Sequence, residues 1–137
     1  MAYRKDWIQP QVGPMGFAGT MKTIGRVVAI SVADNVTANT VGAFKVPAGF
    51  TVTGIIAVAT DMDSGAAMLL AIGDAALSTR YIASLNTQAA VTSTTLAATG
   101  LLFLNTVDTE ILITIATQAG TAVAGTVALY LSGFMAQ

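Results

Sequence analysis

The carboxylates Asp61 and Asp63 have the spacing in this chain that comes closest to a catalytic or metal-binding pair. Two carboxylates about 5 to 9.5 Å apart can hydrolyse a glycosidic bond, and an Asp-x-Asp-x-Gly segment such as 61–65 resembles half of a calcium loop. The twelfth position of a calcium loop requires Glu, and it is Ile72 here. Because aspartates on turns usually bond their own backbone, we interpret the pair as structural. A weak calcium site that also uses Asp74 is the alternative.

Other groups that could carry out catalysis are scarce. The chain has no histidine and no cysteine, which removes the commonest general base, disulfides and thiolate metal ligands. No serine lies in a Gly-x-Ser-x-Gly elbow. Gly42, Gly49 and Gly54 lack the spacing and the lysine of a phosphate-binding loop. We therefore predict that the protein is not an enzyme and needs no cofactor and no metal.

Two classes of binding protein fit the composition poorly. The six Lys and Arg are outnumbered by seven Asp and Glu, so a surface that tracks nucleic-acid phosphates is not expected. Sugar-binding platforms display several aromatic rings, whereas the rings of this chain are scattered. A carbohydrate-binding accessory module stays a minor alternative. The rings that combine stacking with a polar group are those of Tyr3, Trp7, Tyr81 and Tyr130.

The composition is unusually apolar, with 54% hydrophobic and 9% charged residues, against about 25% charged in ordinary globular domains. A membrane-spanning helix needs about 20 consecutive apolar residues, and the longest runs, 66–72 and 101–104, are far shorter. No secretory signal is visible, because Arg4 and Lys5 are followed by Asp6 rather than by an apolar stretch. We expect a protein that is made in the cytoplasm and has no membrane partner. We also expect much of its surface to be buried against other subunits.

Short runs rich in β-branched residues follow one another from residue 24 onward, each closed by Gly, Pro, Asp or Asn. This regular spacing, with no long amphipathic helix, predicts an all-β fold, an antiparallel β-sandwich of jelly-roll type. Immunoglobulin-like connectivity stays open, because sequence does not fix strand order. The expected strands are residues 26–32, 40–46, 50–59, 66–72, 80–85, 101–104, 110–117 and 126–131, with an uncharged loop at 86–98.

Alternation assigns faces within two of these strands. In the first, Phe50, Val52 and Gly54 share one face and Ile55 takes the other. In the strand at 110–117, three isoleucines form a core stripe and Leu112 lies opposite them. The isoleucines are Ile111, Ile113 and Ile115.

Residues 1–23 read as an extended N-terminal arm that precedes the β-sandwich domain, 24–137. The arm holds two of the three prolines and the only tryptophan, Trp7, without sustained periodicity. Four of the six basic residues lie within the first 26 positions, against a single acid, Asp6. A basic arm on a mildly acidic body suggests that the arm binds an acidic surface, although a merely solvated terminus explains it too.

Two long stretches, 81–107 and 111–137, carry no charge. Monomeric β proteins usually protect exposed strand edges with Lys, Pro or inward-pointing charges. Copies of the same chain are the simplest cover for these unprotected edges. We therefore expect a closed homo-oligomer with Leu112 at its interface, and a trimer by analogy with jelly-roll assemblies.

Residues 41–75, which include VGAFKVPAGFTVTGIIAVATDMDSG and LLAIGDA, resemble small virion proteins of bacteriophages. In those proteins a Pro-Ala-Gly turn, a strand that leads to Thr-Asp-x-Asp, and a Leu-x-x-Gly-Asp-Ala element are followed by an arginine and an aromatic residue, here Arg80-Tyr81. The C-terminal ILITIATQAGTAVAGTVALYLSGF resembles them too.

This resemblance implies a β-sandwich that coats or completes a capsid. The expected protein is a decoration or cement subunit on the virion surface that bridges subunits of the major capsid protein, made in the host cytoplasm. A tail, baseplate or head-spike component is the alternative. The arm would then anchor the subunit to the shell, with charged and apolar contacts from Arg4, Lys5, Trp7, Ile8 and Phe17.

Overall fold

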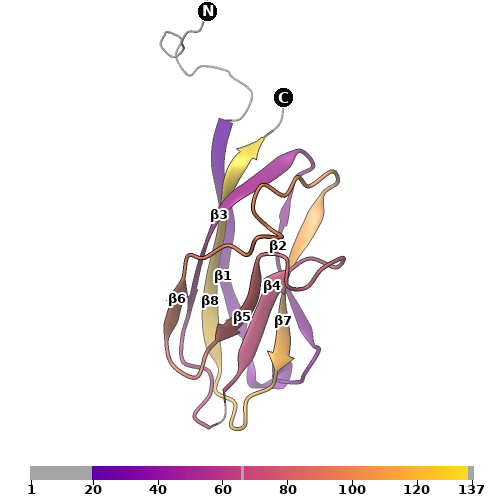
Figure 1. Ribbon diagram of the computed structural model, residues 1–137. Helices are drawn as coiled ribbons and strands as arrows, with labels where there is room; N and C mark the ends of the chain where they lie inside the picture. Colours follow the sequence, from indigo (N-terminus) through magenta and orange to yellow (C-terminus); the bar gives the residue numbers. More distant parts are fainter. Residues whose placement is uncertain (1–19, 66, 136–137) are drawn as a thin grey trace, which may run out of the picture.

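The computed structural model describes residues 20–65 and 67–135, and these form two packed β-sheets (Figure 1). The predicted arm, apart from residues 20–23, therefore lies outside the described residues. One short 3₁₀ helix, η2 (Val32–Asp34), interrupts the β structure. The strands are β1 (Thr20–Ile30), β2 (Thr40–Val46), β3 (Phe50–Ala59), β4 (Leu69–Gly73), β5 (Ile82–Asn86), β6 (Val91–Ser93), β7 (Thr109–Thr117) and β8 (Gly125–Met135).

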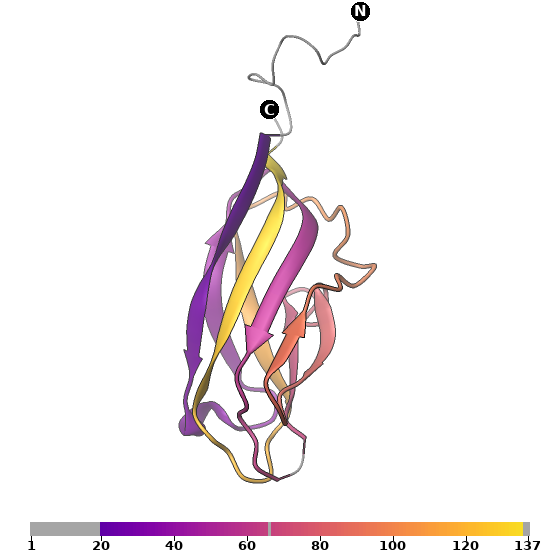
Figure 2. The ribbon, with the colours of Figure 1, turned by 90° about the vertical axis from the view of Figure 1, so that its left-hand side faces the viewer.

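The strand order is that of a jelly roll, which confirms the predicted fold class. Sheet A has the order β1-β8-β3-β6 and sheet B the order β2-β7-β4-β5. The antiparallel pairs are nested: the first strand pairs with the last, the second with the seventh, the third with the sixth and the fourth with the fifth. Each successive pair falls in the other sheet, so the chain forms one long double strand rolled into a sandwich (Figure 2).

The core lies between the sheets and is built by alternation, as predicted for β7. Ile111, Ile113 and Ile115 are fully buried, while Leu112 is only half-buried on the outer side. In β8 the same alternation buries Val127, Leu129 and Leu131. Burying each such side chain contributes about 1.5 to 3 kcal/mol, so alternation in these two central strands fixes which face of each sheet is inside.

A β-bulge in β3 changes one predicted face. The register of β3 against β8 shifts between Val52 and Gly54 and reverses the alternation from that point. Ile55 is consequently buried at 3% exposure, and the prediction that Gly54 shares the face of Val52 while Ile55 takes the opposite face is wrong. Sequence periodicity cannot detect the extra residue of a bulge.

Several strand boundaries also differ from the expectation. β1 begins at Thr20, inside the segment assigned to the arm, and β4 begins at Leu69 rather than at residue 66. Residues 101–104 form no strand: Leu104 makes only an isolated bridge with Thr51. The loop expected at 86–98 contains the short strand β6. No helix in the described residues is long and apolar enough to cross a membrane.

Candidate interaction surfaces

The aspartate pair in the turn after β3 bonds its own backbone. Asp61 accepts the backbone N–H of Asp63 at 3.1 Å, and Asp63 accepts that of Gly65 at 2.7 Å. Asp63 is buried, and its second carboxylate oxygen has no hydrogen-bond partner within the described residues. Asp74, the third suggested calcium ligand, is bound to Arg80 instead. Residues 20–65 and 67–135 hold no group of three or more acidic, histidine or cysteine side chains suited to a metal.

Asp74 organises the loop that joins β4 to β5. Its carboxylate accepts the backbone N–H groups of Ala76 and Leu77 at 3.0 and 2.8 Å. It also accepts Nε and Nη2 of Arg80 at 2.6 and 3.4 Å. The side chains of Asp74 and Arg80 are 5% and 13% exposed. An ion pair this well buried and hydrogen-bonded is costly to break by removing one partner.

Arg80 connects this loop to the long loop between β6 and β7, residues 94–108. Its guanidinium carbon lies 3.7 Å from the centroid of the Phe103 ring, and its backbone carbonyl accepts the hydroxyl of Thr99 at 2.8 Å. The stacked ring covers a cation that the Asp74 pair already orients. The Gly-Asp-Ala and Arg-Tyr elements of the sequence resemblance thus supply the two partners of one ion pair, Asp74 and Arg80.

The loop 94–108 is also bonded along the upper part of β3. Leu102 donates its N–H to Val52, and Asn105 donates to Phe50, at 2.7 and 2.9 Å. Leu102 has a φ of 60°, a left-handed conformation that costs a bulky residue free energy and occurs where the surroundings enforce it. Its side chain is nevertheless 61% exposed. The loop is therefore firmly held while it presents apolar side chains to solvent: Leu101, Leu102, Leu104 and Val107.

Tyr81 packs against this loop on its core side. The side chain is fully buried, and burial raises the pKa of Tyr81 above its ordinary value of 10.0. Asn105 lies against the hydroxyl and opposes part of that rise, although no hydrogen bond of ordinary geometry joins the two side chains. The phenol therefore stays neutral and fills space under the loop.

Between the two loops, on the outer side of sheet B, is a groove of about 370 Å³, within the size range of small-ligand and peptide side-chain pockets. Leu112 of β7 lines it and stands between Gly42 of β2 and Gly73 of β4 in the same cross-strand row. A Cβ on Gly73 would lie 2.2 Å from the carbonyl oxygen of Leu77. Only glycine lets the loop 74–80 lie on the sheet and form one wall of the groove.

The groove has apolar walls and an acidic rim. Phe103, Val107 and Leu112 supply apolar surface, while Asp108 and Glu110 supply two carboxylates that form no ion pair within the described residues. Asp108 is oriented by the backbone N–H of Ala48, at 2.9 Å. A groove of this composition suits a ligand that combines cations with a large apolar group.

The outer face of sheet A is quite different. Cross-strand register places Met21, Phe134 and Thr51 in one row, and Val27, Ala128 and Val58 in another. No described residue that points outward from this sheet is charged. We call it the uncharged face; its large side chains that are more than 40% exposed are Met21, Val27, Ile56 and Val58.

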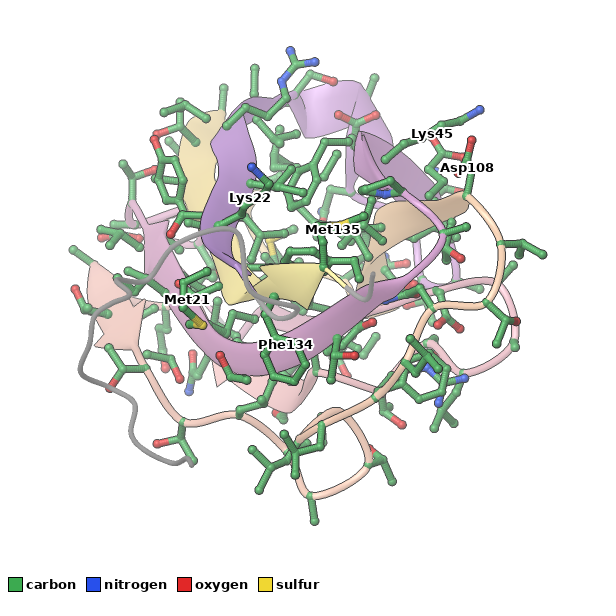
Figure 3. All side chains as sticks on the ribbon, turned by 90° about the horizontal axis from the view of Figure 1, so that it is seen from above. Met21, Lys22, Lys45, Asp108, Phe134 and Met135 are labelled. Atoms are coloured by element: carbon green, nitrogen blue, oxygen red, sulfur yellow. The ribbon has the colours of Figure 1, made fainter. Side chains whose placement is uncertain are left out.

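Figure 3 looks onto the end of the sandwich where β1 begins and shows the two sides together. Met21 and Phe134 lie on one side, and Lys45 and Asp108 lie on the opposite side. Arg26 of β1 is directly opposite Leu129, a core residue, so it points inward at the open edge and reaches solvent there. An inward charge of this kind protects the edge of β1 from pairing with other strands.

The sequence-predicted site residues fall into two groups. Leu112 lies where alternation placed it, on the outer face of sheet B, and lines the groove. The predicted anchoring residues lie outside the described residues. They are Arg4, Lys5, Trp7, Ile8 and Phe17. Sequence reasoning missed the groove, although the quoted Gly-Asp-Ala and Arg-Tyr elements contain the ion pair that supports it.

Comparison with solved structures finds the same fold in two phage capsids. A chain of the cyanophage Pam1 capsid asymmetric unit aligns at a TM-score of 0.71 and 24% identity, over 98% of both chains. A chain of the capsid of Ralstonia phage GP4 aligns at a TM-score of 0.74 and 15% identity, over 93% of this chain and 92% of that one. The chain has a fold that phage capsids use. The resemblance to small virion proteins is thus confirmed at the level of the fold; no protein-family model and no curated protein matches the sequence.

Proposed function

We propose that the protein is a structural subunit of a phage head, of the decoration or cement type, that stabilises the shell by bridging capsid subunits without catalysis. The observation that carries this proposal is the near-complete alignment with chains of two phage capsids. Both alignments leave almost none of this chain for an additional domain. We infer that the aligned chain has one role in the shell.

The surface chemistry supports this assignment. The uncharged face presents Ile56 and Val58 on a regular sheet, where their burial against a neighbour would remove apolar surface from water at about 25 cal/mol per Å². Contiguous apolar patches on soluble monomers are usually small, and larger ones mark interaction sites. We infer that the uncharged face is covered in the particle, with the major capsid protein as its partner.

The arm and the oligomeric state remain parts of this proposal. Residues 1–19 would reach from the start of β1 to an adjacent subunit of the shell. Arg4 and Lys5 would provide electrostatic attraction, and Trp7, Ile8 and Phe17 buried anchors. We expect a trimer, in which three identical weak contacts add by multivalency.

The test uses heads from a phage strain that lacks this protein, to which the purified full-length chain is added back. Wild-type protein should bind the heads and raise the temperature at which they release their genome. Ile56→Lys/Val58→Lys should bind at least about tenfold more weakly, because burying a lysine in an apolar contact is unfavourable. Ala116→Lys, on the exposed outer side of sheet B, is the matched control and should bind normally.

Three outcomes would contradict the proposal in different ways. Recovery of the chain from purified tails but not from heads would favour a tail, baseplate or spike component. Binding to heads without any change in their stability would remove the cement role. Equal binding by the double variant and the control would show that the uncharged face is not the contact surface.

A further inference from the structure

We propose that the groove on sheet B binds residues 3–8 of the N-terminal arm of a second copy of this chain. The inference rests on the proposed function, because it names the partner of the arm as an adjacent copy in the shell. The occupant is a segment that begins before the described residues, Tyr3-Arg4-Lys5-Asp6-Trp7-Ile8.

The chemistry of the groove selects this segment. Asp108 and Glu110 lie at its rim and form no ion pair within the described residues. Lys45 on β2 is directly opposite Glu110 in the strand register, yet the two side chains are not paired. Asp74 is already neutralised by Arg80. The rim therefore has carboxylates available for two adjacent cations, and the apolar walls have room for one large side chain.

The arm carries this combination. Arg4 and Lys5 are adjacent cations, and Trp7 and Ile8 follow within three residues. No other segment of the chain places two adjacent basic residues beside an aromatic ring. Aromatic anchors in a pocket with charged groups at its rim are the usual arrangement of residues that dominate binding energy.

The length and exit point of the arm agree with this placement. The 12 peptide steps from Ile8 to Thr20 span at most about 40 Å, enough to reach a neighbouring molecule. Thr20 begins β1 in sheet A, whereas the groove is on the outer side of sheet B. To fill its own groove the segment before Thr20 would have to pass from sheet A to the outer side of sheet B. The homo-oligomer expected from the uncharged stretches would supply a second copy whose groove can accept the segment.

A charge exchange between two full-length chains tests the proposal. One chain carries Arg4→Glu/Lys5→Glu, and the other carries Glu110→Lys. Alone, each variant should associate at least about tenfold more weakly than wild type, and its solution mass should fall toward the 13.9 kDa of one chain. Mixed in equal amounts, the two should recover part of the association, because the unaltered arm of the second chain then meets the unaltered acidic groove of the first. Circular dichroism of each variant confirms that it folds.

A second pair of variants tests the apolar wall independently. Leu112→Asp should lower the solution mass without unfolding the domain, whereas Ala116→Asp on the same face, which is exposed and away from the groove lining, should leave it unchanged. Trp7→Ala in the arm should match Leu112→Asp. If all of these variants keep the wild-type mass, the groove is not the contact.

The remaining outcomes also decide the question. A monomeric wild-type chain, or variants that weaken association without recovery on mixing, overturns the proposal and assigns the arm to its own groove or to the major capsid protein. Failure here while the chain still binds heads removes only this inference. Charge exchange that succeeds with a chain that does not bind heads removes only the proposed function.

Discussion

The two outer faces of the sandwich rest on the same kind of core but have opposite surface chemistry. The outer face of sheet A carries polar and apolar side chains and no charge among its described residues. The outer face of sheet B carries a buried ion pair, a groove and an acidic rim. The first provides area that any apolar partner can cover, and the second provides shape and charge that few partners match. Area and selectivity are thus assigned to different sheets.

Much of the difference arises from loops, and the strands of sheet B add the outward charges of Lys45 and Glu110. β8 and β7 are both alternating strands with fully buried inward side chains. On sheet B, however, the loop 74–80 lies over Gly73, and the loop 94–108 is held beside it by Arg80. Changes in the loop 74–80 should therefore alter the outer face of sheet B and leave that of sheet A intact.

The largest effect should come from Arg80→Ala. It leaves the buried Asp74 carboxylate without its cation and removes the stacking on Phe103, which should destabilise the fold by about 3 kcal/mol. Arg26→Ala, at the exposed edge of β1, should change stability by no more than about 0.5 kcal/mol. Urea denaturation of both variants measures the difference. Equal stability of the two would show that the ion pair does not hold the groove side together.

Gly73→Ala compared with Gly54→Ala contrasts the two sheets directly. A Cβ at Gly73 would meet loop backbone at 2.2 to 2.6 Å, whereas at Gly54 the nearest atom is the Ser132 Cβ at 3.9 Å. The first should cost about 2 kcal/mol through overpacking, and the second should be nearly neutral. Thermal melting of the pair tests this. A tolerated alanine at residue 73 would mean that the loop 74–80 can move away from the sheet without cost.

The smallest of these effects concerns Tyr81 and alkaline pH. Because burial raises its pKa in the folded state, the unfolded chain loses this proton first once the pH rises above about 10. The folded state then binds more protons, so stability should fall with rising pH, by at most about 1.4 kcal/mol per unit for this one group. Tyr81→Phe should flatten that decline. An identical decline in wild type and Tyr81→Phe would place the alkaline sensitivity elsewhere.

The sequence predicted the class of fold because it is encoded locally. Alternation in residues 110–117 and turn residues such as Pro47 and Gly49 are consequences of backbone geometry, and Gly49 indeed takes a φ of 90°. The bulge at Val52 and Gly54 was invisible, because one extra residue changes register without changing composition. Four consecutive apolar residues at 101–104 look like a strand, yet the backbone bonds of β3 hold them in a loop.

The candidate surfaces were predicted only in part. Leu112 followed from alternation, since its neighbours Ile111 and Ile113 had to face the core. The groove did not follow, because its walls come from residues as far apart as Asp74 and Phe103, and their meeting depends on the strand order. The absence of charge in residues 81–107 predicts a surface that is covered by another subunit. It does not predict on which side of the sandwich that surface lies.

The nested strand pairing also constrains how the chain can be made. During synthesis β1 emerges first, but its only partner within the sheet is β8, at the C-terminal end. The β4–β5 hairpin, by contrast, joins neighbours in sequence and can close early. Folding should therefore proceed from the middle of the chain outward and finish only once β8 has been made, in milliseconds to seconds as for other β folds with distant pairings. Until then β1, β3 and their apolar side chains are exposed to other nascent copies.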